Sequence, residues 1–133
     1  MKSGMDRGIR VGLVLMGLIA LLGGFGFVFA PTQMEADFSI VASRVDGLGT
    51  IRADLGGMFL MAACFMFYGS RPGMSAWLVV PIVLLLTVLF GRTVHILIDG
   101  ISQPAIRSTV VEIVALVFLE FSRRKLAANT HQV

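Results

Sequence analysis

Six ionisable residues lie within or beside long apolar stretches of this sequence, and their types and spacing could support chemistry. They are Arg52, Asp54, Arg92, His95, Asp99 and Glu112. A charged side chain at the depth of lipid costs about 2.5–3.5 kcal/mol even on a lenient scale, so each of these groups needs a compensating partner. The partners that the chain can offer therefore indicate where a polar site would form.

The strongest expected partnership joins Arg92 to Glu112. Arg92 precedes Asp99 by seven residues, about 10 Å of helix, and Glu112 follows Arg107 by five residues, about 7.5 Å. If two antiparallel helices meet at the short 99–104 connection, Arg92 and Glu112 reach similar depths from the same end. The sequence therefore predicts a charge-assisted pair between them.

The other four residues are expected to extend this pair into a cluster. Arg92, His95 and Asp99 are separated by three and four residues, which places them along one helix face. Arg52 and Asp54 stand at the start of another apolar stretch and could join from a neighbouring helix. We predict that these six residues form a ligand-binding polar cluster.

Two further interpretations of the cluster stay open. A buried Arg–Glu pair can simply set the register between helices, and charges at a membrane rim can extend to the headgroups. His95 and Asp99, at i,i+4 spacing, could add acid–base chemistry. A hydrogen-bonded structural histidine is the commoner case, so we predict no catalytic residue.

Other chemistry finds no support in the sequence. The single cysteine, Cys64, permits no intrachain disulfide, and His95 is the only histidine in an apolar stretch, so no metal-ligand set and no bis-histidine haem site can be recognised. Phosphate-binding, dinucleotide-binding and nucleophile-elbow motifs are absent. The eleven Lys and Arg residues are dispersed, which does not indicate a nucleic-acid partner. No cofactor and no metal are predicted.

The elements that must position the cluster are long apolar helices. Of the 133 residues, 56% are apolar and only 14% are charged, which is too apolar for a soluble domain of this length. Crossing a hydrocarbon core takes about 20 apolar residues, and four stretches approach that length: 11–30, 53–69, 75–98 and 105–121. The sequence predicts one membrane domain, residues 1–133, of the all-α class.

The number of crossings depends on the fourth stretch, which Arg107, Glu112 and Glu120 interrupt and which could instead be an amphipathic surface helix. With four crossings, seven basic residues fall on the cytoplasmic side and four on the outer side, as the positive-inside rule requires. With three, the basic run 123–125 would lie outside. We therefore expect an up-down-up-down four-helix bundle with both termini cytoplasmic.

The first stretch is expected to remain as a helix rather than to be removed as a signal peptide. Its apolar run of 20 residues exceeds the roughly 7–15 of a signal peptide, and Pro31 would follow the cleavage position. The segment 31–52 is the one long connection and is expected outside. Its alternately apolar stretch 38–45 predicts a short interfacial helix or a lid.

Short connections predict which helices are antiparallel neighbours. The 69–73 turn joins the second and third stretches, and the 99–104 connection joins the third and fourth. Pro104 suits the first turn of a helix, with Ser102 or Gln103 as its cap.

Small residues at helical spacing indicate close helix contacts. Gly17, Ala20 and Gly24 lie on one face of the first stretch, and the second stretch offers Gly56 and Ala63 among others. In lipid, such faces let helix backbones approach closely. We favour a contact within the bundle, and a homodimer interface is the alternative.

Several short motifs, taken in order, resemble the bacterial family known as domain of unknown function 4345, whose members are small four-span membrane proteins. The residues that carry the resemblance are Pro31, Arg52-Ala53, Gly56-Gly57, Gly91-Arg92, Gly100, Pro104 and Glu112. The sequence departs from the family pattern at His95 and in the wide gap between Gly100 and Pro104. The resemblance implies a four-helix fold in the bacterial inner membrane and supplies no activity.

The sequence therefore predicts a multi-pass membrane protein without enzymatic activity. It would bind a lipid-like molecule or act as an accessory subunit of a larger membrane complex. The alternative is a small intramembrane enzyme, isomerase-like, that acts on a hydrophobic substrate through His95, Asp99 and Glu112. A third possibility is a structural homo-oligomer that uses the Gly17, Ala20, Gly24 face. The expected partners are membrane lipid, a hydrophobic small molecule and other membrane subunits.

Overall fold

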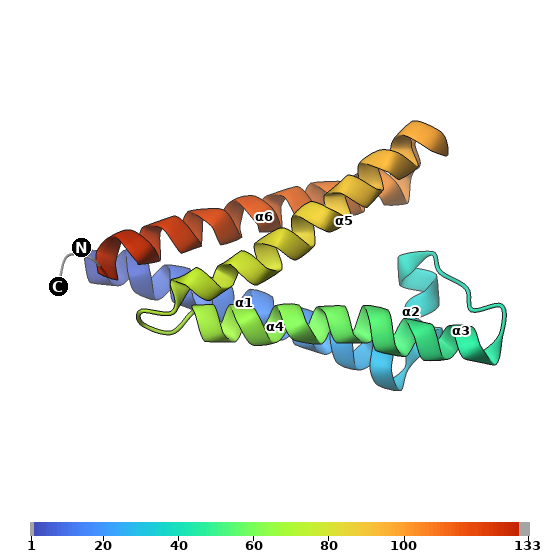
Figure 1. Ribbon diagram of the computed structural model, residues 1–133, viewed down its shortest axis with the longest axis horizontal. Helices are drawn as coiled ribbons and strands as arrows, with labels where there is room; N and C mark the ends of the chain where they lie inside the picture. Colours follow the sequence, from blue (N-terminus) through green and yellow to red (C-terminus); the bar gives the residue numbers. More distant parts are fainter. Residues whose placement is uncertain (1, 131–133) are drawn as a thin grey trace.

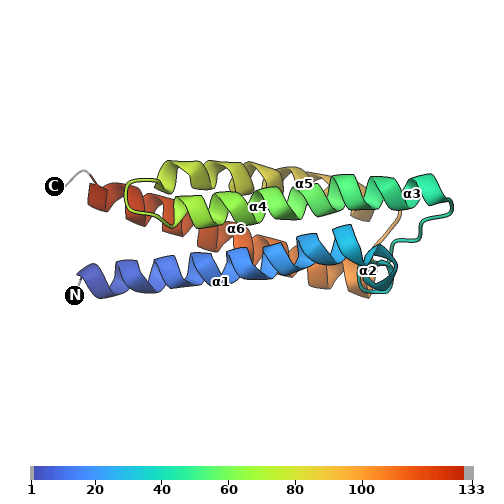
Figure 2. The ribbon, with the colours of Figure 1, turned by 90° about the horizontal axis from the view of Figure 1, so that it is seen from below.

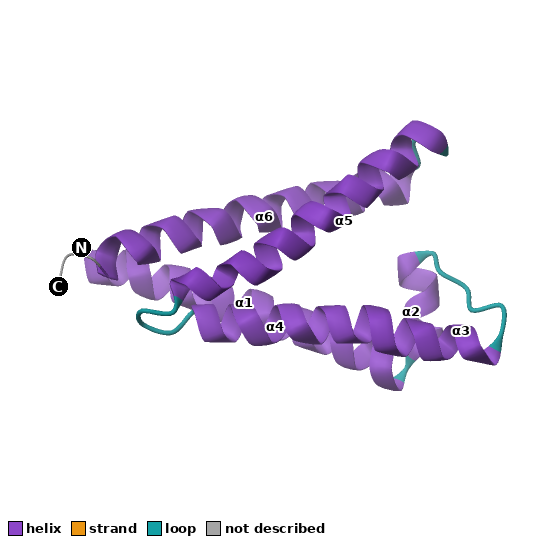
Figure 3. Cartoon of the chain, viewed as in Figure 1, coloured by secondary structure: helices purple, strands orange, loops and turns teal. Residues whose placement is uncertain are grey.

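The computed structural model describes residues 2–130, and every regular element in that part of the chain is helical, as predicted (Figure 3). The elements are α1 (Lys2–Phe29), α2 (Pro31–Phe38), α3 (Val45–Thr50), the π-helix η1 (Ile51–Gly56), α4 (Gly57–Gly69), the 3-10 turn η2 (Ser75–Leu78), α5 (Val79–Ile98) and α6 (Gln103–Thr130). The described chain is therefore all-α.

Within residues 2–130, three helical segments are long and apolar enough to cross a membrane: Gly4–Phe29, Val45–Gly69 and Ser75–Ile98. The fourth long segment, α6, has 28 residues. Any 18 consecutive residues of α6 include at least three charged side chains, so composition alone does not mark α6 as a crossing. This difference matches the weakness expected of the 105–121 stretch.

The second long segment begins earlier than predicted. α3, η1 and α4 follow one another without interruption, so the helix starts at Val45 rather than at residue 53. Its π-helical part buries Ile51 and Gly56. A π-helical turn is rare and occurs mostly as a short stretch within an α-helix, as it does here. The long connection shrinks accordingly to the few residues 39–44.

The expected short helix in the 31–52 connection is α2, although it precedes most of the stretch that suggested it. Pro31 lies in the first turn of α2, where a backbone N–H would have no partner within the helix. Proline therefore costs no hydrogen bond at this position. The ring of Phe38 then packs on Phe27, at 4.7 Å between ring centroids, and on Phe59, at 5.9 Å. This aromatic contact packs α2 against the end of α1 and the start of α4.

Glycines bring α1 and α4 into close contact. A Cβ atom at Gly24 would lie 2.7 Å from Leu60 Cδ2, and one at Gly17 would lie 2.7 Å from Phe67 Cε1. Ala20, between them, is buried. The small-residue face of α1 is thus covered by α4, which confirms a contact between helices of the same chain and leaves that face unavailable for a homodimer.

The hydrophobic core lies at one end of the molecule. Its buried members come from all four long segments: Ile9, Leu13, Ala62, Met66, Leu78, Ile82, Leu119 and Leu126. At the same end, the amide of Asn129 donates to both carboxylate oxygens of Asp6 at 2.8 and 2.9 Å, which joins α6 to α1. We call this the basic end, because it also holds Arg7, Arg10, Arg71, Arg123, Arg124 and Lys125.

Toward the opposite end the helices separate into two pairs. Figures 1 and 2 show α1 and α4 side by side. After the 70–74 turn, α5 and α6 form a hairpin that diverges from α4 (Figure 1). We call the far end the acidic end; it holds Glu35, Asp37, Asp46, Asp54 and Asp99. The tip of the α5–α6 hairpin lies well apart from α2 and α3 in Figure 1.

The tip of this hairpin has the expected helix cap. The backbone N–H of Ala105 donates to the Ser102 hydroxyl at 3.3 Å, so Ser102 takes the capping role that the sequence left open between two residues. Gly100 has a φ of 96°, a backbone conformation that favours glycine. These features let the chain reverse within 99–102 and place α6 beside α5.

Candidate functional site

The predicted pair between Arg92 and Glu112 is present. Arg92 Nε donates to both carboxylate oxygens of Glu112 at 3.1 Å, and Nη2 lies 3.0 Å from Oε1. The geometry joins α5 to α6 at the depth expected from helix rise. Multiple contacts between a guanidinium and a carboxylate are stronger and more directional than a single one.

The pair is only partly covered. The side chain of Arg92 is 32% exposed and that of Glu112 is 15% exposed. The pair lies where α5 and α6 face each other, whereas Phe90 and Val94 on α5 and Val111 on α6 are exposed. The ion pair is therefore held between two helices that expose several apolar side chains close to it.

His95 and Asp99 form a second, separate pair. Nδ1 of His95 lies 2.9 Å from Oδ2 of Asp99, one turn along the same helix. The two side chains are 45% and 62% exposed. The contact is the i,i+4 relation that the sequence predicted, and it lies at the outer part of the hairpin, in the open.

The structure does not bring Arg52 and Asp54 into contact with the other four residues. Both residues lie in η1, are exposed, and make no hydrogen bond or ion pair with another described residue. η1 packs against α1, α3 and α4, whereas the α5–α6 hairpin diverges from these helices toward the acidic end (Figure 1). The six predicted site residues therefore form two pairs and two solitary side chains.

A further ion-pair group at the basic end was not singled out from the sequence. Glu120 accepts hydrogen bonds from Arg123 at 2.8 Å and from Arg124 at 2.6 Å. The hydrogen bonds to Glu120 raise the pKa of Arg123 above its ordinary value. The i,i+3 and i,i+4 spacing of these residues was the available signal. The group satisfies Glu120 near the end of α6.

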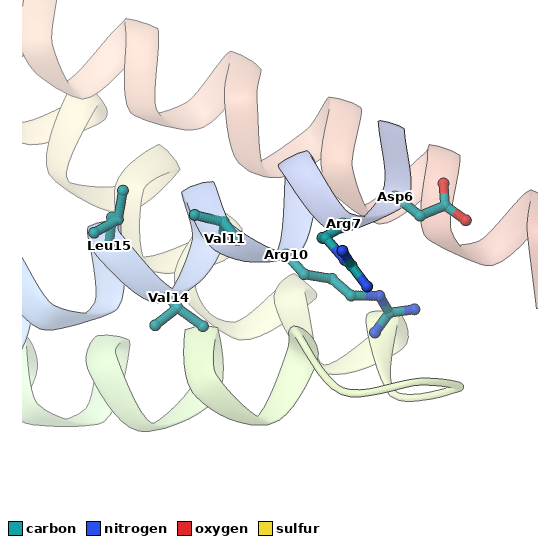
Figure 4. Close-up of a pocket in the computed structure, with 6 residues that line it drawn as sticks. All are labelled: Asp6, Arg7, Arg10, Val11, Val14 and Leu15. Atoms are coloured by element: carbon teal, nitrogen blue, oxygen red, sulfur yellow. The ribbon is translucent and has the colours of Figure 1, made fainter. Parts of the chain in front are cut away.

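Two pockets in the described chain lie away from the predicted cluster. One is a groove of about 460 Å³ along the first turns of α1, lined by Asp6, Arg7, Arg10, Val11, Val14 and Leu15 (Figure 4). The other, of about 360 Å³, is lined by Cys64, Phe65, Tyr68 and Trp77. Neither has a member of the predicted cluster among its lining residues.

Aromatic rings line the second pocket, and a cation lies over one of these rings. The rings of Tyr68 and Phe65 each lie 5.8 Å from that of Trp77, and the guanidinium of Arg71 lies 5.3 Å from the Tyr68 ring. Aromatic residues beside a cation are typical of the level at which a helix leaves a membrane. Among the described residues, no three His, Cys, Asp or Glu side chains are grouped so that they could hold a metal ion.

Comparison of the chain with protein-family models, with curated proteins and with solved structures found no match.

Proposed function

We propose that this protein crosses a bacterial inner membrane four times, with both termini on the cytoplasmic side. Three segments have the length and composition that a crossing requires. The fourth, α6, runs back beside α5, and its 28 residues extend about 42 Å. Both ends of the described chain lie at the basic end (Figure 1), as an even number of crossings requires.

The charges of α6 are compatible with a crossing because each of its two glutamates is neutralised by an ion pair with arginine. Toward the acidic end, Glu112 is paired with Arg92. Toward the basic end, Glu120 is paired with Arg123 and Arg124. The residues between, 113–119, are all apolar. Paired charges near both ends and an apolar middle suit a helix that traverses lipid.

The charge difference between the two ends supports the orientation. The basic end carries Arg7, Arg10, Arg71, Arg123, Arg124 and Lys125. Cytoplasmic segments of membrane proteins carry an excess of Lys and Arg. The basic end therefore belongs on the cytoplasmic side, and the segment 31–44 with α2 belongs outside.

Within that membrane, we propose a non-enzymatic role as an accessory subunit that packs against another membrane protein through the α5–α6 hairpin. The observation that carries this proposal is the partial cover of the Arg92–Glu112 pair, in which the Arg92 side chain is 32% exposed. Hydrocarbon solvates a guanidinium poorly, so contact with lipid tails alone would leave Arg92 in an unfavourable environment. A helix of a partner protein would supply it.

The surface around the pair suits a helix contact in lipid. Exposed apolar side chains flank the pair on both helices of the hairpin: Phe90, Val94 and Leu97 on α5, and Val110, Val111 and Val114 on α6. Helix association in membranes depends on tight van der Waals packing together with a few polar contacts. This hairpin offers both on one arm of the molecule.

A lipid-like ligand is the second candidate, and the same exposed guanidinium favours it. An anionic headgroup of the outer leaflet could reach Arg92 from the acidic end. The enzyme alternative has less support, because His95 and Asp99 lie in the open and neither described pocket includes them. The family resemblance noted above fits the four-span proposal and adds no activity to it.

Native mass spectrometry of the protein purified in mild detergent tests this proposal. We expect the chain with a second membrane protein in a defined ratio, and we expect the double variant R92L/E112L, which removes the pair without stranding a charge, to lose that protein. The control R124Q, at an exposed ion pair of the basic end, should keep it. A chain with bound lipid and no protein would contradict the accessory role and favour the ligand.

A further inference from the structure

The groove along the first turns of α1 combines two cations with an apolar wall. Arg7 and Arg10 are three residues apart, and their side chains extend next to one another from α1 (Figure 4). Val11, Val14 and Leu15 continue the groove along the helix, and all three are exposed. Charge at one end and hydrocarbon at the other match the two parts of an amphiphile.

The two arginines differ in how the fold uses them. Arg10 Nη1 donates a hydrogen bond to the carbonyl oxygen of Ser70, the C-cap residue that follows α4. This contact joins residues 60 positions apart and fixes the position of the Arg10 guanidinium. Arg7 is exposed and has no hydrogen-bond or ion-pair partner among the described residues. One arginine is thus positioned by the fold, and the other is available to an anion.

The carboxylate in the groove is already engaged. Both oxygens of Asp6 accept hydrogen bonds from Asn129 of α6, at 2.8 and 2.9 Å. Figure 4 shows the Asp6 carboxylate directed away from the two guanidinium groups. No ion pair joins Asp6 to Arg7 or Arg10 in the described structure, so the positive charge of the groove is not neutralised by direct contact.

We infer that this groove binds one anionic phospholipid of the cytoplasmic leaflet, with its phosphate at Arg7 and Arg10 and an acyl chain along Val11, Val14 and Leu15. The inference rests on the proposed four-span arrangement, which puts the start of the apolar part of α1 at headgroup level. A phosphate there meets two guanidinium groups, and the chain below it covers side chains that would otherwise face free lipid. Each basic residue near a charged membrane surface favours an anionic lipid by about five-fold.

The test uses the full chain in lipid nanodiscs that contain equal amounts of phosphatidylglycerol and phosphatidylcholine. Native mass spectrometry after release from the disc measures which lipid stays bound. We expect one retained phosphatidylglycerol per chain, and a loss of preference of about five-fold for R7Q and more for R7Q/R10Q. The single variant R7Q is included because it should fold normally, since Arg7 has no hydrogen-bond or ion-pair partner among the described residues.

The matched control is R124Q/K125Q, which removes the same charge from the same end of the molecule but outside the groove. It should keep the preference. The variant V11S/L15S should lower retention of the lipid while leaving the binding of inorganic phosphate unchanged, since it alters only the apolar wall.

Four results would overturn the inference. An equal loss in R7Q/R10Q and R124Q/K125Q would show a general attraction to charge rather than a site. Full displacement of the lipid by millimolar inorganic phosphate would make the ligand a free anion. If the protein resists carbonate extraction from membranes but retains both lipids equally, the lipid site is excluded and the proposed membrane insertion is unaffected. Release of the protein by carbonate would contradict the lipid site and the membrane insertion alike.

Discussion

The guanidinium of Arg92 in α5 contacts both carboxylate oxygens of Glu112 in α6, at 3.0 to 3.1 Å. It is the side-chain ion pair that joins α5 to α6 among the described residues. The pair is not part of the hydrophobic core, and the hairpin that it joins diverges from α1 and α4 toward the acidic end (Figure 1). It therefore stabilises the arm of the molecule that has least other support.

Removal of one member should be asymmetric in its effect. The variant E112A leaves Arg92 charged between apolar helices, and we expect a loss of about 2–3 kcal/mol in the free energy of unfolding in detergent. The variant R92A should cost less, because Glu112 can take up a proton and become neutral. Thermal unfolding of purified variants measures both.

Exchange of the two partners tests whether they truly act on each other. The variant R92E/E112R restores opposite charges at the same two positions and should recover part of the loss seen in E112A. The control R124A removes an exposed pair and should change stability by less than about 1 kcal/mol. A swap that is no better than the worse single variant would show that Arg92 and Glu112 depend on different neighbours.

The contact between α1 and α4 predicts opposite effects for two glycines of the same helix. A Cβ at Gly24 would lie 2.7 Å from Leu60 Cδ2 and 3.1 Å from the Leu60 backbone nitrogen, whereas one at Gly8 would meet nothing within 4 Å. G24A should therefore lower stability by about 1–3 kcal/mol. G8A should raise it by up to about 1 kcal/mol, because alanine favours the helix. Similar melting temperatures for the two variants would contradict this packing.

The aromatic contact of α2 predicts a local change without loss of the core. The variant F38A removes the ring that packs on Phe27 and Phe59, so α2 and the 39–44 segment should open more often. A loss of about 1.4 kcal/mol would speed amide hydrogen exchange there about tenfold. V41A is the control, since Val41 is 83% exposed. Unchanged exchange in F38A would show that α2 is held by other contacts.

The Arg92–Glu112 pair could be predicted because it depends on local geometry. The helix rise sets the depth of each residue, and the short 99–104 connection makes the two helices antiparallel neighbours. Arg52 and Asp54 could not be placed in the same way. Their position depends on how far the α5–α6 hairpin diverges from α4, which is a matter of tertiary packing.

The lipid groove proposed on α1 shows the same limit of sequence reasoning. In the sequence, Arg7 and Arg10 are two of the seven basic residues that predict a cytoplasmic N-terminus. The contact from Arg10 to the Ser70 carbonyl joins positions 60 residues apart, and no periodicity in the sequence reports it. The face of Gly17 and Gly24, by contrast, was expected to be a helix contact, and its partner within the chain is α4.

Cysteine accessibility in intact cells tests whether α6 crosses the membrane. In a background with Cys64 replaced by alanine, single cysteines at Ser43, Gln103 and Ala128 are treated with a membrane-impermeant maleimide. The four-span account predicts labelling from outside at Ser43 and Gln103, and labelling at Ala128 only after the membrane is opened. Labelling of Ala128 from outside together with Gln103 would show that α6 lies on the surface, and it would contradict the account.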